Sequence, residues 1–144
     1  MTYQEFGNKN ASTVLIQPVD NHGLKAVESE MKYIRANCER DFCLLAIVVD
    51  DWNRDLSPWS APAVFGNEPF GDGAEATLDY ILGLCGNKDR AYHLGGYSLA
   101  GLFSLWAACQ TDAFEGIMAS SPSVWFPGFT ELIRSHSVSA GKCT

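Results

Sequence analysis

The sequence has few residues of the kinds that hold metals or build disulfide frameworks. Its three histidines, His22, His93 and His136, lie far apart along the chain, and its five cysteines include no C-x-x-C pair. A zinc site needs clustered cysteine and histidine ligands. An odd cysteine count without paired spacing favours reduced thiols over a disulfide framework. We therefore expect no metal, no cofactor and a cytoplasmic protein.

Other motifs and segments are also missing. No apolar run approaches the length that spans a bilayer, so we expect no membrane partner. Residues 1–7 lack the basic and apolar regions of a secretory signal. No G-x-x-x-x-G-K-[ST] or G-x-G-x-x-G phosphate loop follows a strand, which argues against a nucleotide-binding fold. The formal net charge of −7 repels phosphate backbones, so nucleic acid is not an expected partner.

What is present suits a folded core. The chain has 144 residues, of which 47% are hydrophobic and 19% are charged. This balance is typical of a globular protein, and the length is that of one domain, residues 1–144.

Apolar segments of strand and helix type alternate along the chain. The segment at 42–49 is continuously apolar, as expected of a strand covered on both faces. Alternation of strands and helices predicts an α/β fold with three layers, α/β/α, around a mostly parallel sheet. The expected strands are 12–19, 42–49, 91–97 and 114–120, and the expected helices are 24–36, 74–84, 99–110 and 129–135.

The region around Ser98 has the layout of a nucleophile elbow. An apolar strand leads into Gly96, Ser98 follows two residues later, and Ala100 and Gly101 open an apolar helix. Such a sharp turn holds a serine hydroxyl above the end of a sheet and requires small neighbours. Ser98 is therefore the candidate nucleophile.

The connection at 50–73 is unusually long and contains three prolines and two tryptophans. Loops of this length inside a compact domain are usually functional or disordered, and the aromatic content argues against disorder. A loop that leaves the carboxyl end of a strand lies where open α/β sheets bind ligands. We expect a ligand-binding role for this segment.

Three stretches together resemble a known family. They are R-D-L-S-P at 54–58, G-G-Y-S-L-A-G-L-F at 95–103 and S-P-S-V-W at 121–125. In this order and at these places they resemble the esterase D and enterochelin-esterase-like group of α/β-hydrolases. The resemblance covers about residues 14–129.

This resemblance implies a serine hydrolase that cleaves carboxylic esters through an acyl-enzyme on Ser98. The backbone N–H of Leu99, the residue after the nucleophile, is implied as one oxyanion-hole donor. The second donor is expected from the backbone near Asp20, in the loop after the first predicted strand. The expected partner is a small-molecule ester.

Two side chains are implied at the mouth of the pocket. Arg54 would hold an anionic group of the substrate, or instead form a salt bridge to Asp55 or Asp51 that orders the loop. Trp125 would stack on an acyl or aryl group, or instead pack beneath its own loop.

A base and an acid for Ser98 are hard to find in this sequence. The triad order in α/β-hydrolases is serine, then acid, then histidine, and His136 is the only histidine after Ser98. His93 is expected in the core, whereas His22 and His136 remain alternatives for the base. We expect an incomplete α/β-hydrolase domain that is weak or inactive as an esterase, with exposed sheet edges that favour a homo-oligomer. The alternative is a non-catalytic α/β module that binds a ligand or partner.

Overall fold

The computed structural model describes residues 1–136 of the chain. It contains a five-stranded sheet in the order β1-β3-β2-β4-β5. β1 pairs with β3 in the antiparallel sense, and every other neighbouring pair is parallel. The strands are β1 (Thr2–Gly7), β2 (Thr13–Val19), β3 (Cys43–Val48), β4 (Ala91–Tyr97) and β5 (Gly116–Ser120).

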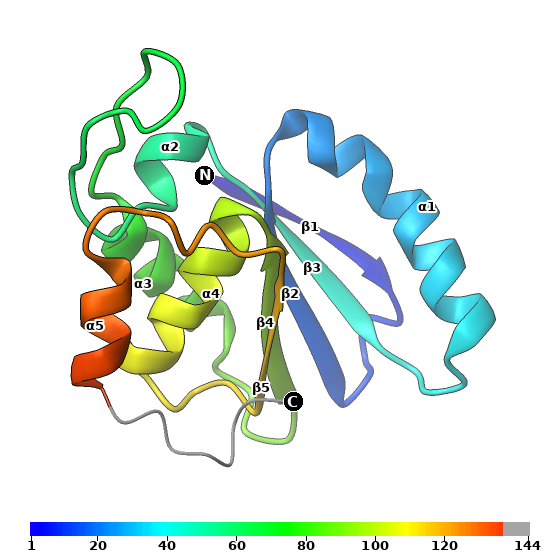
Figure 1. The fold of residues 1–144 in the computed structure, drawn as a ribbon. Coiled ribbons are helices and arrows are strands. Elements are labelled where there is room, and N and C mark those ends of the chain that lie inside the picture. Colours follow the sequence, from blue (N-terminus) through cyan, green and yellow to red (C-terminus); the bar gives the residue numbers. More distant parts are fainter. Residues whose placement is uncertain (137–144) are drawn as a thin grey trace.

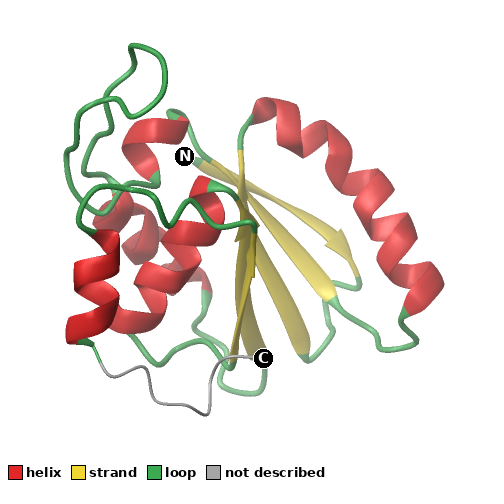
Figure 2. Ribbon diagram, viewed as in Figure 1, coloured by secondary structure: helices red, strands yellow, loops and turns green. Residues whose placement is uncertain are grey.

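Helices cover the sheet on both faces (Figure 1). α1 lies on one face, whereas α3, α4 and α5 lie on the other, so the described part has three layers (Figure 2). The predicted α/β/α architecture with a mostly parallel sheet is confirmed. The helices are α1 (Asn21–Asn37), α2 (Trp52–Asp55), α3 (Ala74–Leu84), α4 (Leu99–Gln110) and α5 (Phe129–Ser135).

The core follows from the apolar content of the central strands. All six residues of β3 are buried, which agrees with its continuous apolar sequence. A smaller apolar cluster, which includes Val27 and Met31 of α1, packs on one face of the sheet. A larger cluster, which includes Phe103 and Trp106 of α4, packs on the other. Two separate apolar faces explain why the sheet needs helices on both sides.

Three details differ from the sequence-based expectation. β1 was not expected, because its side chains are mostly exposed and show no apolar pattern; backbone pairing with β3 holds it at the edge. The helix expected at 24–36 begins earlier, at Asn21, because the carboxylate of Asp20 caps it by accepting a hydrogen bond from the Gly23 N–H at 2.6 Å. The long connection contains the one-turn helix α2.

Within residues 1–136, we find no helix that is both long and apolar enough to cross a membrane.

Candidate active site

Ser98 lies at the sharp turn between β4 and α4, at the carboxyl edge of the sheet. Its backbone has φ 57° and ψ −117°, a conformation that residues with a side chain rarely adopt. Holding a non-glycine residue in such a region costs about 1–3 kcal/mol and requires support from the surrounding structure. The expected strained elbow is therefore present at Ser98.

Backbone hydrogen bonds hold Ser98 in this conformation. Its N–H donates to the carbonyl of Ser120 at 3.0 Å. Its carbonyl accepts from the N–H groups of Leu102 and Ser123, both at 3.1 Å. The strained residue is thus fixed by its own helix and by the loop after β5.

The chain crosses itself closely at the elbow, which requires glycine at position 96 and favours it at position 101. A Cβ on Gly96 would lie 2.5 Å from the Cβ of Ala100. A Cβ on Gly101 would lie 3.0 Å from the Gly96 carbonyl oxygen and 3.2 Å from the Pro122 Cα. These contacts explain the small residues on both sides of Ser98.

The start of α4 offers free hydrogen-bond donors beside Ser98. The first hydrogen bond of the helix joins the Leu102 N–H to the Ser98 carbonyl. The N–H groups of Leu99, Ala100 and Gly101 therefore have no acceptor within the helix. The positive end of the helix dipole lies at the same place. These groups are available to an oxyanion, and the role of Leu99 as an oxyanion-hole donor stays a prediction.

A pocket of about 190 Å³ opens at the elbow. Ser98 and the buried Ser123 both line it, and their side-chain oxygens lie 3.1 Å apart. The lining residues come from the turn at Ser98, from the loop after β5 and from the long connection. They are Trp52, Asn53, Phe65, Phe70, Ser98, Leu99, Ser123 and Trp125.

Three aromatic rings form one wall of this pocket. Phe65 and Trp125 meet edge to face with ring centroids 5.0 Å apart, and Phe70 lies 6.0 Å from Trp125. Trp125 is 45% exposed and lines the pocket rather than being fully covered by its own loop, and its contact with a substrate stays a prediction.

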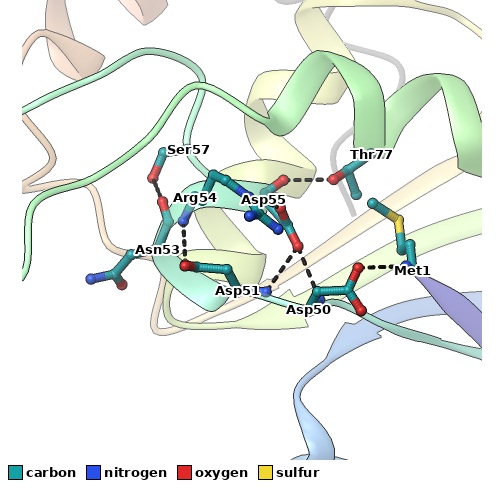
Figure 3. A network of polar contacts seen from close by, with 8 residues as sticks. All are labelled: Met1, Asp50, Asp51, Asn53, Arg54, Asp55, Ser57 and Thr77. Carbon is teal, nitrogen blue, oxygen red and sulfur yellow. Dashed lines mark hydrogen bonds and ion pairs between the residues drawn. The ribbon is translucent and has the colours of Figure 1, made fainter.

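A polar network holds α2 at the pocket (Figure 3). The buried carboxylate of Asp55 accepts the N–H groups of Asp50 and Asp51 at 2.9 Å each, and the Arg54 Nε at 2.7 Å. The Asp55 carbonyl accepts the Thr77 hydroxyl at 2.7 Å, which ties α2 to α3. The network therefore positions the α2 residues that line the pocket.

This network holds the Arg54 side chain against Asp55. Its guanidinium forms an ion pair with Asp55, and Arg54 is not among the pocket-lining residues. This arrangement corresponds to the loop-ordering alternative. Burial alone would raise the pKa of Asp55, but hydrogen bonds from Arg54 and from the Asp51 and Asp50 N–H groups hold that pKa below its usual range.

Asp20 does not line the pocket in the described residues. It lies after the carboxyl end of β2, which is the correct edge of the sheet, and it serves as the N-cap of α1. Its carbonyl accepts the Leu24 N–H at 2.9 Å. The structure thus gives Asp20 a helix-capping role, and a second oxyanion donor near Asp20 remains a prediction.

No histidine or carboxylate lines the pocket within residues 1–136. His93 is on β4 opposite Gly116, near the start of both strands and five residues before Ser98, so it lies roughly 16 Å along the strand from the elbow. His136 follows α5, which runs from the carboxyl edge toward the opposite edge of the sheet (Figure 1). His22 lies exposed in the first turn of α1.

The described residues contain no group of three or more histidine, cysteine or acidic side chains placed to hold a metal ion. Burial raises the pKa of the Cys85 thiol to about 11, and also raises the pKa values of Cys43 and Cys109. None of these thiols lines the pocket.

Several pocket residues were not identified individually from the sequence. Trp52, Asn53, Phe65 and Phe70 all belong to the long connection that was expected to bind a ligand. Ser123 belongs to the S-P-S-V-W stretch at 121–125. This stretch contributed to the family resemblance, but it did not predict a role for the Ser123 hydroxyl. Spacing alone does not reveal which loop side chains meet Ser98, because the contacts depend on how two separate loops fold.

The chain has the α/β-hydrolase fold, which it shares with solved structures described as esterases and hydrolases. The siderophore hydrolase EstA from Aspergillus nidulans matches with a TM-score of 0.63 and 20% identity, over 90% of this chain and 52% of that chain. The chain thus spans about half the length of EstA.

Two further solved structures share the fold. Brefeldin A esterase, a bacterial homologue of human hormone-sensitive lipase, matches with a TM-score of 0.53 and 15% identity, over 84% of this chain and 36% of that chain. FphF, a fluorophosphonate-binding serine hydrolase from Staphylococcus aureus, matches with a TM-score of 0.52 and 11% identity, over 84% of this chain and 57% of that chain. No protein-family model and no curated protein sequence matches the chain.

Proposed function

We propose that the chain is the nucleophile-bearing part of a serine hydrolase that cleaves carboxylic esters. The observation that carries this proposal is the strained backbone of Ser98, which is held at φ 57° where β4 meets α4. Ser98 also lines a pocket. Strained backbone of this kind is characteristic of functional sites. Structures of the same fold include proteins described as esterases and serine hydrolases, which supports the proposal.

The reaction follows from the groups at the elbow. The Ser98 Oγ attacks the carbonyl carbon of the ester while its proton passes to a general base. The carbonyl oxygen becomes an oxyanion, which the Leu99 N–H at the start of α4 stabilises. The tetrahedral intermediate expels the alcohol, which takes up the proton, and leaves an acyl group on Ser98. Water then releases the acid by the same steps.

The general base is the group that the described site does not supply. A serine hydroxyl is a poor nucleophile without a base, and the only side chain hydrogen-bonded to Ser98 Oγ in residues 1–136 is Ser123. We propose that a histidine and an acid from beyond these residues, or from another chain, complete the triad. The chain by itself is then a weak esterase or an inactive one.

A fluorophosphonate probe followed by mass spectrometry tests this proposal. Such probes form a covalent bond to an activated serine. On the isolated chain we expect slow adduct formation on Ser98 and none in the Ser98→Ala variant. An adduct on another serine while Ser98 stays unlabelled would overturn the proposal. A folded chain without any adduct would show that this chain alone is inactive, as expected where the base lies outside the described residues.

A non-catalytic binding module is the second candidate, favoured by the absence of a histidine or carboxylate from the described pocket lining. Ser98→Ala distinguishes the two functions. It abolishes covalent labelling if Ser98 is a nucleophile, whereas ligand binding by a non-catalytic module does not depend on covalent chemistry at Ser98.

We further propose a reducing, cytoplasmic location and a small-molecule ester as the partner, with no nucleic acid or membrane partner. The cysteines among the described residues, Cys38, Cys43, Cys85 and Cys109, are all free, which supports a reducing compartment.

A further inference from the structure

We propose that the pocket at Ser98 takes uncharged esters that carry a single aromatic ring. This inference rests on the proposed function, since it names the substrate class of the same site. It follows from three independent properties of the pocket: the arrangement of its aromatic side chains, its volume and its charge.

The aromatic wall is exposed where a ligand would contact it. Phe65 is 71% exposed and Trp125 is 45% exposed, and the two rings meet at 79°. Edge-to-face arrangements with centroids about 4.5–7 Å apart are those that aromatic rings prefer with one another. A ligand ring that enters the pocket would extend this arrangement and cover apolar surface that is now in water.

The loop that carries Phe65 is held in place at its base. Ala61 and Phe70 exchange backbone hydrogen bonds of 3.3 and 2.8 Å, which close the segment between them. The Gly71 N–H donates to the Asn53 carbonyl at 3.2 Å and connects this segment to α2. The aromatic wall is therefore largely preformed, which lowers the entropic cost of binding.

The described pocket has room for about one ring. A cavity of about 150 Å³ lined by apolar side chains is known to hold benzene, and this pocket measures about 190 Å³. Pockets for drug-sized ligands are larger, at about 300–1,000 Å³. One ring next to the ester group fits the described space, whereas a long acyl chain extends beyond it.

The charges around the pocket favour a neutral ligand. None of the described lining residues carries a charge. Arg54, the side chain expected to hold an anionic group, pairs with Asp55 at 2.7 Å. The formal net charge of −7 further disfavours the approach of an anionic ester.

Ligand-observed saturation-transfer NMR with four esters tests the inference. The esters are benzyl acetate (neutral, aromatic), ethyl butyrate (neutral, aliphatic), monoethyl succinate (anionic) and acetylcholine (cationic). We expect benzyl acetate to bind best, with little or no binding of the two charged esters. Stronger binding of acetylcholine would indicate a cation site made of aromatic rings, and stronger binding of monoethyl succinate an anion site; either result would overturn the inference.

Matched variants assign the binding to the aromatic wall. Phe65→Ala should weaken benzyl acetate binding about three- to tenfold, because one aromatic pair is lost. Tyr33→Ala, which removes a ring that is 72% exposed on α1, should leave binding unchanged. Equal effects of the two substitutions would contradict the inference. Binding is also measured in Ser98→Ala, where it should persist, so that failure of Ser98 as a nucleophile is separable from failure of the aromatic pocket.

Discussion

The side-chain oxygens of Ser98 and Ser123 lie 3.1 Å apart although 25 residues separate them in the chain. The Ser123 N–H also donates to the Ser98 carbonyl at 3.1 Å. Ser123 is thus bonded to both the backbone and the hydroxyl of the candidate nucleophile. Because Ser123 is 1% exposed, water does not readily replace its hydroxyl in this contact.

Removing the Ser123 hydroxyl should slow the reaction of Ser98. In Ser123→Ala, the Ser98 Oγ loses the partner that fixes its rotamer. A hydrogen bond contributes about 1 kcal/mol, so we expect about fivefold slower fluorophosphonate labelling of Ser98. The rate is measured by mass spectrometry over time.

Ser104→Ala is the matched control for this prediction. Ser104 is also buried on α4, but its hydroxyl donates to the Ala100 carbonyl at 2.8 Å and not to Ser98. We expect an unchanged labelling rate for this variant. If Ser123→Ala labels as fast as the unmodified protein, Ser123 has no positioning role.

Gly96→Ala should damage the elbow. The added Cβ would lie 2.5 Å from the Ala100 Cβ, so α4 must move away from β4. Overpacking of this kind costs about 1–3 kcal/mol, and the start of the helix would shift from Ser98. We expect a lower urea midpoint and loss of labelling at Ser98.

Gly83→Ala is a control, because we expect this substitution to raise the stability of the protein rather than lower it. Gly83 lies exposed in α3, and a Cβ there meets nothing within 4 Å. Replacing a helical glycine by alanine stabilises by about 0.5–1 kcal/mol. A Gly96→Ala protein as stable as Gly83→Ala would show that the elbow is not closely packed.

Asp55→Asn should destabilise the protein and loosen the pocket. The uncharged amide weakens the ion pair with Arg54 and the hydrogen bonds from the Asp50 and Asp51 N–H groups. Hydrogen bonds to a charged group contribute about 1.5–3 kcal/mol to stability. Because Arg54 is partly exposed, solvent weakens its ion pair with Asp55. We therefore expect the free energy of unfolding to fall by about 2 kcal/mol at pH 7. Urea unfolding measures it.

The same variant tests the pH dependence. The pKa of Asp55 is lower in the folded protein than in the unfolded chain. Its stabilisation is therefore fully present above the unfolded pKa of about 3.9 and is lost as the pH falls below that value. We expect the difference between Asp55→Asn and the unmodified protein to shrink between pH 5 and pH 2.

Asp79→Asn serves as the control for both measurements. Asp79 is an exposed acid on α3, and its substitution should change neither the stability nor its pH profile. If the free energy of unfolding of Asp55→Asn differs from that of the unmodified protein by the same amount down to pH 2, the ionised carboxylate does not have the proposed role.

The local pattern of residues determined most of the fold. The continuous apolar run of β3 and the apolar segments at 74–84 and 99–110 predicted their elements, because strand and helix patterns are local properties of the chain. The elbow at Ser98 was also predictable, because the close crossing of β4 and α4 requires small residues near Ser98 in the sequence. β1 was not predicted, because it is held by backbone pairing with β3 rather than by buried side chains.

The composition of the pocket was decided only by the tertiary structure. Nothing local brings Ser123 to Ser98 or places Phe65 against Trp125. The sequence by itself determined the elbow, the strands β2 to β5 and the helices α1, α3, α4 and α5, since each of these elements depends on residues near one another in the chain. The pocket depends on contacts between distant loops, and those exist only once the strands have aligned their carboxyl ends at one edge of the sheet.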